Sequence, residues 1–72
     1  METTTLIVRS GGDREAIQRA RDVLAQEPGV NRVLTDPERG RIFVRHSRAK
    51  APRARLLENL EAAGVKATIQ SR

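Results

Sequence analysis

The pattern of apolar and polar residues along the chain predicts four strands and two helices. Alternating residues of high β propensity predict strands over residues 3–9, 30–35, 41–46 and 65–70. Apolar side chains at helical spacing predict helices over residues 14–27 and 53–63. Pro28 and Gly29 end the first helix, and Pro52 suits the first turn of the second.

The order of these elements, βαββαβ, is that of the ferredoxin-like sandwich. Right-handed crossovers then give a four-stranded antiparallel sheet in the order 4-1-3-2, with both helices on one face. Because 72 residues are too few for two hydrophobic cores, we expect a single α+β domain over residues 1–72.

Four short motifs fall at the spacing of one known family. They are Leu6 to Val8, Pro28 to Val30, Gly40 to Val44, and Ala63 to Val65. With these motifs the sequence resembles the heavy-metal-associated domains of copper chaperones and metal-transporting P-type ATPases, from about residue 4 to residue 69. The resemblance implies the ferredoxin-like fold and a role in metal homeostasis.

The family's metal-binding motif is missing from this chain. Counting back from Pro28 places the two positions of the family's Cys-x-x-Cys loop at Asp13 and Ala16, and the chain has no cysteine. Cu(I) needs soft sulfur ligands, and one carboxylate cannot replace two thiolates. The sequence therefore resembles a cysteine-free branch of the family, and we expect no thiolate site and no cofactor.

Two carboxylates near the first helix offer an alternative metal site. Asp13 and Glu15 could hold a hard cation, although two carboxylates are too few for tight binding without waters or a partner. The simpler interpretation is a helix cap, with Asp13 at the N-cap and Glu15 near the positive end of the helix dipole. A weak hard-metal-ion site at Asp13 and Glu15 stays open as an alternative function.

Positive charge gathers between the third strand and the second helix. The chain has fourteen basic and nine acidic residues, a net charge of +5, and residues 39–57 include no acid. We call the lower part of this stretch the basic pole, made of Arg45, His46, Arg48, Lys50, Arg53 and Arg55. A solvated surface explains such charges, and so does docking to an acidic protein. The family resemblance suggests a metal-transporting P-type ATPase as that partner, with an anionic membrane surface as an alternative.

Two details of the basic pole bear on its chemistry. Arg53 and Arg55 lie at the start of a helix, where their charge opposes the helix dipole and a bound anion would relieve it. We expect His46 to be an exposed surface residue, too far from the Asp13 loop to share a metal ion with it.

Strand alternation places Ile7, Leu34 and Phe43 on the sheet face away from the helices. The arginines expected around them are Arg9, Arg32, Arg41 and Arg45. An apolar patch with a basic rim predicts a contact surface, most simply in a homodimer stacked sheet to sheet. RNA-recognition domains share the element order and stack bases on this face, but Ile7 is not aromatic, so nucleic-acid binding is only a minor alternative.

The sequence argues against an enzyme. Ser47 follows His46, but adjacent strand residues point to opposite faces and cannot form a nucleophile–base pair, and no phosphate-binding glycine motif is present.

No apolar run approaches the roughly 20 residues that span a bilayer, and the N-terminus does not resemble a signal peptide. We therefore predict a cytoplasmic binding or adaptor module.

Overall fold

The computed structural model describes residues 1–9 and 14–70 of the chain. Its elements are β1 (Glu2–Val8), α1 (Arg14–Ala25), β2 (Val30–Asp36), β3 (Arg41–His46), α2 (Arg53–Ala62) and β4 (Ala67–Ile69). The predicted βαββαβ order is confirmed. The largest difference from the prediction is β4, which has only three residues because Val65 turns into the core ahead of the strand.

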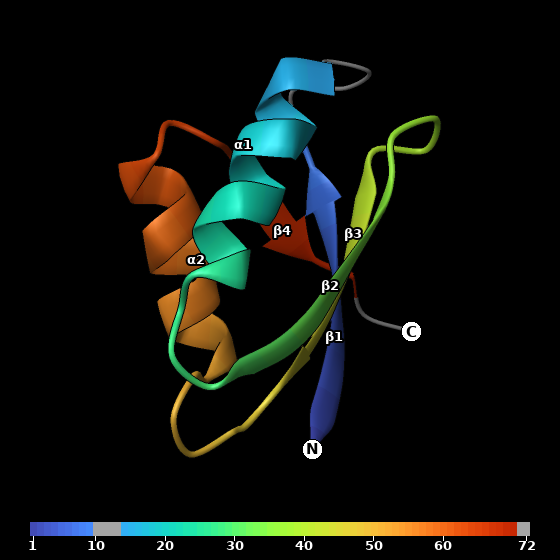
Figure 1. The fold of residues 1–72 in the computed structure, drawn as a ribbon. Coiled ribbons are helices and arrows are strands. Elements are labelled where there is room, and N and C mark those ends of the chain that lie inside the picture. The colour runs from blue at the N-terminus through green and yellow to red at the C-terminus, as the bar shows by residue number, and fades with distance from the viewer. Residues whose placement is uncertain (10–13, 71–72) are drawn as a thin grey trace.

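The four strands form one antiparallel sheet in the order β2-β3-β1-β4. This is the predicted order read from the opposite edge. Both helices lie against one face of the sheet, and no described helix or strand covers the other face (Figure 1). The structure is therefore the two-layer ferredoxin-like sandwich that the sequence predicts.

The core lies between the sheet and the two helices. Leu6, Ile42 and Val44 point into it from the central strands, and all three are fully buried. The helices close the core with Leu24 from α1 and with two leucines of α2, Leu56 and Leu60. Each fully buried aliphatic side chain of this size contributes about 1.5–3 kcal/mol, so this layer supplies most of the driving force for folding.

The loop after β3 packs closely against the loop before β2. Gly29 has a φ of +96°, and the backbone N–H of Ser47 donates a 2.8 Å hydrogen bond to its carbonyl. A Cβ at position 29 would lie 2.6 Å from the Cβ of Lys50. Gly29 thus allows the segment that carries Arg48 and Lys50 to fold back beneath the sheet.

Candidate functional site

The loop that corresponds to the family's metal site is only partly described. Asp13 lies outside the described residues, while Glu15 is exposed in the first turn of α1. Within residues 1–9 and 14–70, no three His, Cys, Asp or Glu side chains come together as a metal site would require. A hard-metal site at Asp13 and Glu15 remains a prediction.

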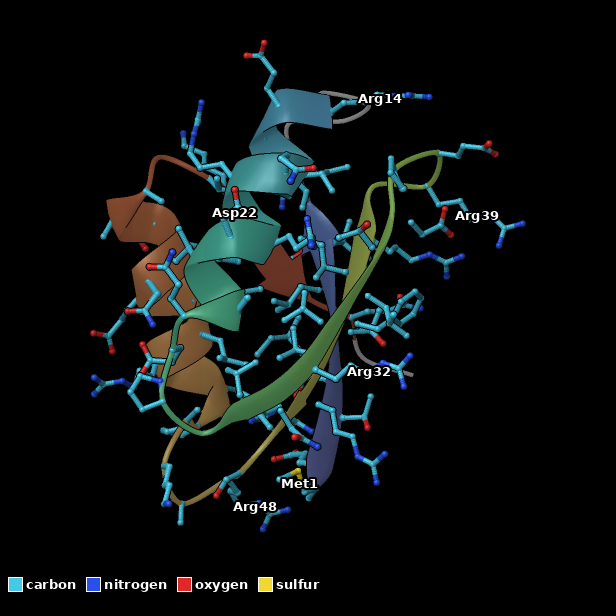
Figure 2. The ribbon with its side chains drawn as sticks, in the orientation of Figure 1. Met1, Arg14, Asp22, Arg32, Arg39 and Arg48 are labelled. Carbon is cyan, nitrogen blue, oxygen red and sulfur yellow. The ribbon has the colours of Figure 1, made fainter. Side chains whose placement is uncertain are left out.

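At the basic pole, β1 supplies an acid that the local sequence does not contain. Glu2 forms an ion pair with Arg53, with Nη2 to Oε2 at 2.5 Å, and accepts a hydrogen bond from Arg48, with Nε to Oε1 at 3.4 Å. Burial raises the pKa of the Glu2 carboxyl, but the charges of Arg53 and Arg48 and the Arg48 hydrogen bond outweigh burial and lower the pKa overall. Figure 2 shows Arg48 beside Met1, at the end of the molecule where β1 begins.

A second acid reaches the basic pole from the end of the first helix. Glu27 accepts from Arg55, with Nε to Oε2 at 2.6 Å, and from the side-chain amide of Asn59. The Arg55 hydrogen bond is the main reason why the pKa of Glu27 is lowered, and burial opposes it. The first turn of α2 has no acid of its own, so Glu2 and Glu27 supply the negative charge that its arginines and its dipole favour.

The expectation that His46 is exposed is wrong. His46 follows Ile42 and Val44 at two-residue spacing, so it faces the helices and is fully buried. Its Nδ1 donates to the carbonyl of Ala51 at 2.6 Å, and its Nε2 lies 2.7 Å from the hydroxyl of Thr4. His46 is therefore a structural side chain that fastens the 47–51 loop to β1, and it offers nothing to a docking partner.

These contacts leave few basic side chains at the basic pole free to bind a partner. Arg48, Arg53 and Arg55 are all paired with Glu2 or Glu27, which lie far away in the sequence. Lys50 is exposed and has no ion pair with a described residue. Sequence reasoning missed the two acids because only the tertiary fold brings them to this end. The predicted antiparallel pairing of the first and third strands was a signal for the first of them, because it brings the start of β1 to the end of β3, where Glu2 pairs with His46.

The open sheet face carries the predicted apolar residues. Phe43 pairs with Leu34 on β2 and with Thr5 on β1, which makes one transverse row across the sheet. Leu34 is 51% exposed, whereas Phe43 is partly covered. Ile7 lies diagonal to Phe43, because its partner on β3 is Arg41. Ile7, Leu34 and Phe43 therefore lie on the sheet face away from the core, and their role as a contact surface stays a prediction.

Arginines surround this row, and their environments differ. Arg41 lies with its guanidinium carbon 6.0 Å from the centre of the Phe43 ring and its Nη2 atom 3.8 Å from Asp36. Arg32 and Arg45 are paired directly across β2 and β3, both exposed, and neither forms an ion pair with a described residue. Like charges directly opposed on neighbouring strands destabilise a sheet. Among the described residues, no acid therefore compensates this pair of positive charges beside the apolar row.

Comparison with solved structures identifies the architecture. The chain superposes on a copper-binding domain from HMA7, a P-type ATPase, with a TM-score of 0.88 and 18% identity, covering 99% of this chain and 96% of that one. The chain has the heavy-metal-associated fold.

Two further structures show the same likeness. The N-terminal domain of PacS from Synechocystis gives a TM-score of 0.83 and 17% identity over 99% of this chain and 100% of that one. Oxidised MerP from Ralstonia metallidurans gives 0.86 and 21% identity, covering 97% of each chain. No family model matches the sequence, and no curated protein matches it.

The fold is thus that of a heavy-metal-associated domain, and the chain contains none of the cysteines on which thiolate metal binding depends. None of the described helices is long and apolar enough to cross a membrane.

Proposed function

We propose that this protein is a non-catalytic binding module that docks an acidic protein surface on the open face of its sheet. The observation that carries the proposal is the opposed pair Arg32 and Arg45 beside the exposed side chain of Leu34. A carboxylate placed between two guanidinium groups would remove their mutual repulsion, and an apolar partner side chain would cover Leu34.

The basic pole is the weaker of the two docking surfaces. Arg53 and Arg55 already hold carboxylates at 2.5 Å and 2.6 Å, so a docking acid would have to compete with Glu2 and Glu27. Lys50 adds long-range attraction for an acidic partner without a geometrically defined contact. The basic pole would therefore increase the rate of association, while the sheet face determines which partner fits.

A protein partner suits the sheet face better than a nucleic acid does. The face offers Phe43 as its one aromatic, and the Arg41 guanidinium lies near that ring. Asp36, two residues from Leu34 on the same face, would repel phosphates. A protein surface with mixed acidic and apolar residues avoids this conflict.

The fold suggests the setting in which such a module would act. Solved structures of this fold include a copper-binding P-type ATPase domain and the CopZ metallochaperone. Without thiolates this chain would not carry copper as such domains do. We favour an adaptor in cytoplasmic metal homeostasis, with the acidic surface of a metal-transporting ATPase as its partner.

The experiment is an NMR titration of the ¹⁵N-labelled protein with a peptide that alternates Glu and Leu. Amides of Arg32, Leu34, Phe43 and Arg45 should shift, and R32E/R45E should abolish the shifts. The matched control R19E changes an exposed arginine on α1 and should leave binding intact.

Shifts confined to residues 48–55 would overturn the sheet-face assignment, and a response only to single-stranded RNA would favour the nucleic-acid alternative. A titration with Zn²⁺ or Mg²⁺ that shifts residues 14–16 would favour the metal alternative.

A further inference from the structure

One edge of the sheet is a long strand with a free side. Within the described part of the chain, β2 pairs with β3 alone, so its outer edge presents unpaired backbone N–H and C=O groups. The register shifts between Val30 and Arg32, which leaves residues 32–36 as the regular part of the strand. An edge of this kind can receive another strand if the side chains on the two strands match.

The regular part of β2 matches itself. Arg32, Leu34 and Asp36 alternate on the open face, with the apolar residue between opposite charges. If two copies pair antiparallel about Leu34, each Arg32 lies opposite Asp36 of the other copy, and the two Leu34 side chains lie side by side. Opposite charges and apolar pairs across neighbouring strands both stabilise a sheet.

Neighbouring registers lack this match. Pairing centred on Val33 would place Arg32 opposite Leu34, and pairing centred on Thr35 would place Leu34 opposite Asp36. Each of these sets a charge against an apolar side chain, whereas the Leu34-centred register does not. We propose that two copies of this chain pair through β2 in that register and join their sheets into one eight-stranded sheet.

The pairing would also reduce the repulsion between Arg32 and Arg45 on the open face. Arg32, which is opposed by Arg45 and has no ion pair with a described residue, gains the carboxylate of Asp36 from the second copy. Asp36 can accept this contact, because its present distances to Arg39 and Arg41 are 4.0 Å and 3.8 Å. The apolar row becomes continuous from one copy to the other, in the order Phe43, Leu34, Leu34, Phe43.

Charge complementarity favours this edge contact over a sheet-to-sheet dimer. Stacking two open faces would bring two sets of Arg32, Arg41 and Arg45 together, with Asp36 as the one acid among the paired residues of each face. Edge pairing keeps these arginines spread across one surface and leaves that surface open. The inference does not rest on the proposed docking of an acidic partner, but the two proposals share Arg32 and Leu34, so the two contacts would compete for these side chains.

Charge reversal of the two ionic residues gives the decisive experiment. R32D and D36R each place like charges opposite each other at both ends of the paired strands, whereas R32D/D36R restores opposite charges in reversed order. A contact limited to residues 32–36 of each copy is small for a specific protein interface, and small interfaces bind weakly. We therefore expect a dissociation constant on the order of 10–100 μM for the natural chain. Each single variant should weaken self-association at least about tenfold, and the double variant should return to within about threefold.

Sedimentation equilibrium measures the association, and a ¹H–¹⁵N spectrum of each variant shows whether it has folded. A mixture of R32D and D36R should associate although neither does so alone. In a half-labelled sample of the natural chain, isotope-filtered NOEs should connect Leu34 methyl groups of different copies. A natural chain that is monomeric up to about 1 mM would overturn the proposal. So would a dimer that both single variants leave unchanged, or a double variant as weak as the single ones.

Discussion

Replacing His46 tests whether a buried polar side chain holds the basic pole together. In H46L, the Ala51 carbonyl loses its donor and the Thr4 hydroxyl loses its acceptor, and both groups lie in a buried environment. Each buried group left without a partner costs about 1–3 kcal/mol, so the variant should lose about 2–5 kcal/mol of unfolding free energy. A domain of this length has about 4–11 kcal/mol in total, so the loss would be large.

The assay is urea denaturation followed by far-UV circular dichroism, because the chain has no Trp or Tyr for fluorescence. The matched control is R19A, which changes an exposed arginine on α1 and should shift the free energy of unfolding by less than about 0.5 kcal/mol. T4V should cost about 1–3 kcal/mol by itself but much less in the H46L background, since the partner is then already gone. A neutral H46L, or costs that simply add, would refute the buried network.

The same hydrogen bonds determine the tautomer of His46. A carbonyl can only accept, so the 2.6 Å contact with Ala51 places the proton on Nδ1. In the neutral ring, Nε2 then accepts from the Thr4 hydroxyl, whose oxygen accepts from Arg53 Nε at 3.3 Å. Long-range ¹H–¹⁵N spectra of the neutral ring should show the Nδ1–H form. The Nε2–H form would contradict this assignment of donors and acceptors.

Two further predictions concern acid and glycine. The pKa values of Glu2 and Glu27 are lowered in the folded protein, so both carboxylates stabilise the fold above about pH 4.5, and this stabilisation is lost as the pH falls through their folded-state pKa values. E27Q should therefore flatten the acid limb of a profile of unfolding free energy against pH. An unchanged profile would contradict the ion pairs. G29A should lose at least about 1 kcal/mol more unfolding free energy than G64A. Both glycines have positive φ, but only at Gly29 would a new Cβ meet the Cβ of Lys50, at 2.6 Å. Equal shifts in melting temperature would argue against the close packing of the two loops.

The fold could be predicted from the sequence because its signals are local or periodic. The two helices follow from apolar spacing, and the sheet order follows from the handedness of the crossovers. The outward positions of Ile7, Leu34 and Phe43 follow from strand alternation alone, and the pairing of Leu34 with Phe43 agrees with them. The short β4 and the ends of the first two strands and of the helices differ from the prediction, since these depend on where individual side chains such as Val65 enter the core.

The electrostatics of the surface could not be predicted in the same way. Residues 39–57 contain no acid, yet Glu2 comes from 46 residues before Arg48 and Glu27 from 28 residues before Arg55. His46 was misplaced for a simpler reason. The alternation that places Ile42 and Val44 inward also places position 46 inward, and its neighbouring arginines suggested a solvent-exposed segment instead.

The distribution of acids explains why the sheet face, and not the basic pole, is the better candidate for recognition. Glu2 and Glu27 approach the basic pole closely enough to form ion pairs with three arginines, which fixes those side chains against the domain. On the sheet face, Asp36 stays 3.8 Å or more from its two arginines, and Arg32 and Arg45 face each other without an acid among the described residues. A cation that is already paired gains little from a new carboxylate, whereas an opposed pair of cations gains from the first one that arrives. Binding selectivity should therefore follow substitutions at Arg32 and Arg45 more closely than substitutions at Arg53 and Arg55.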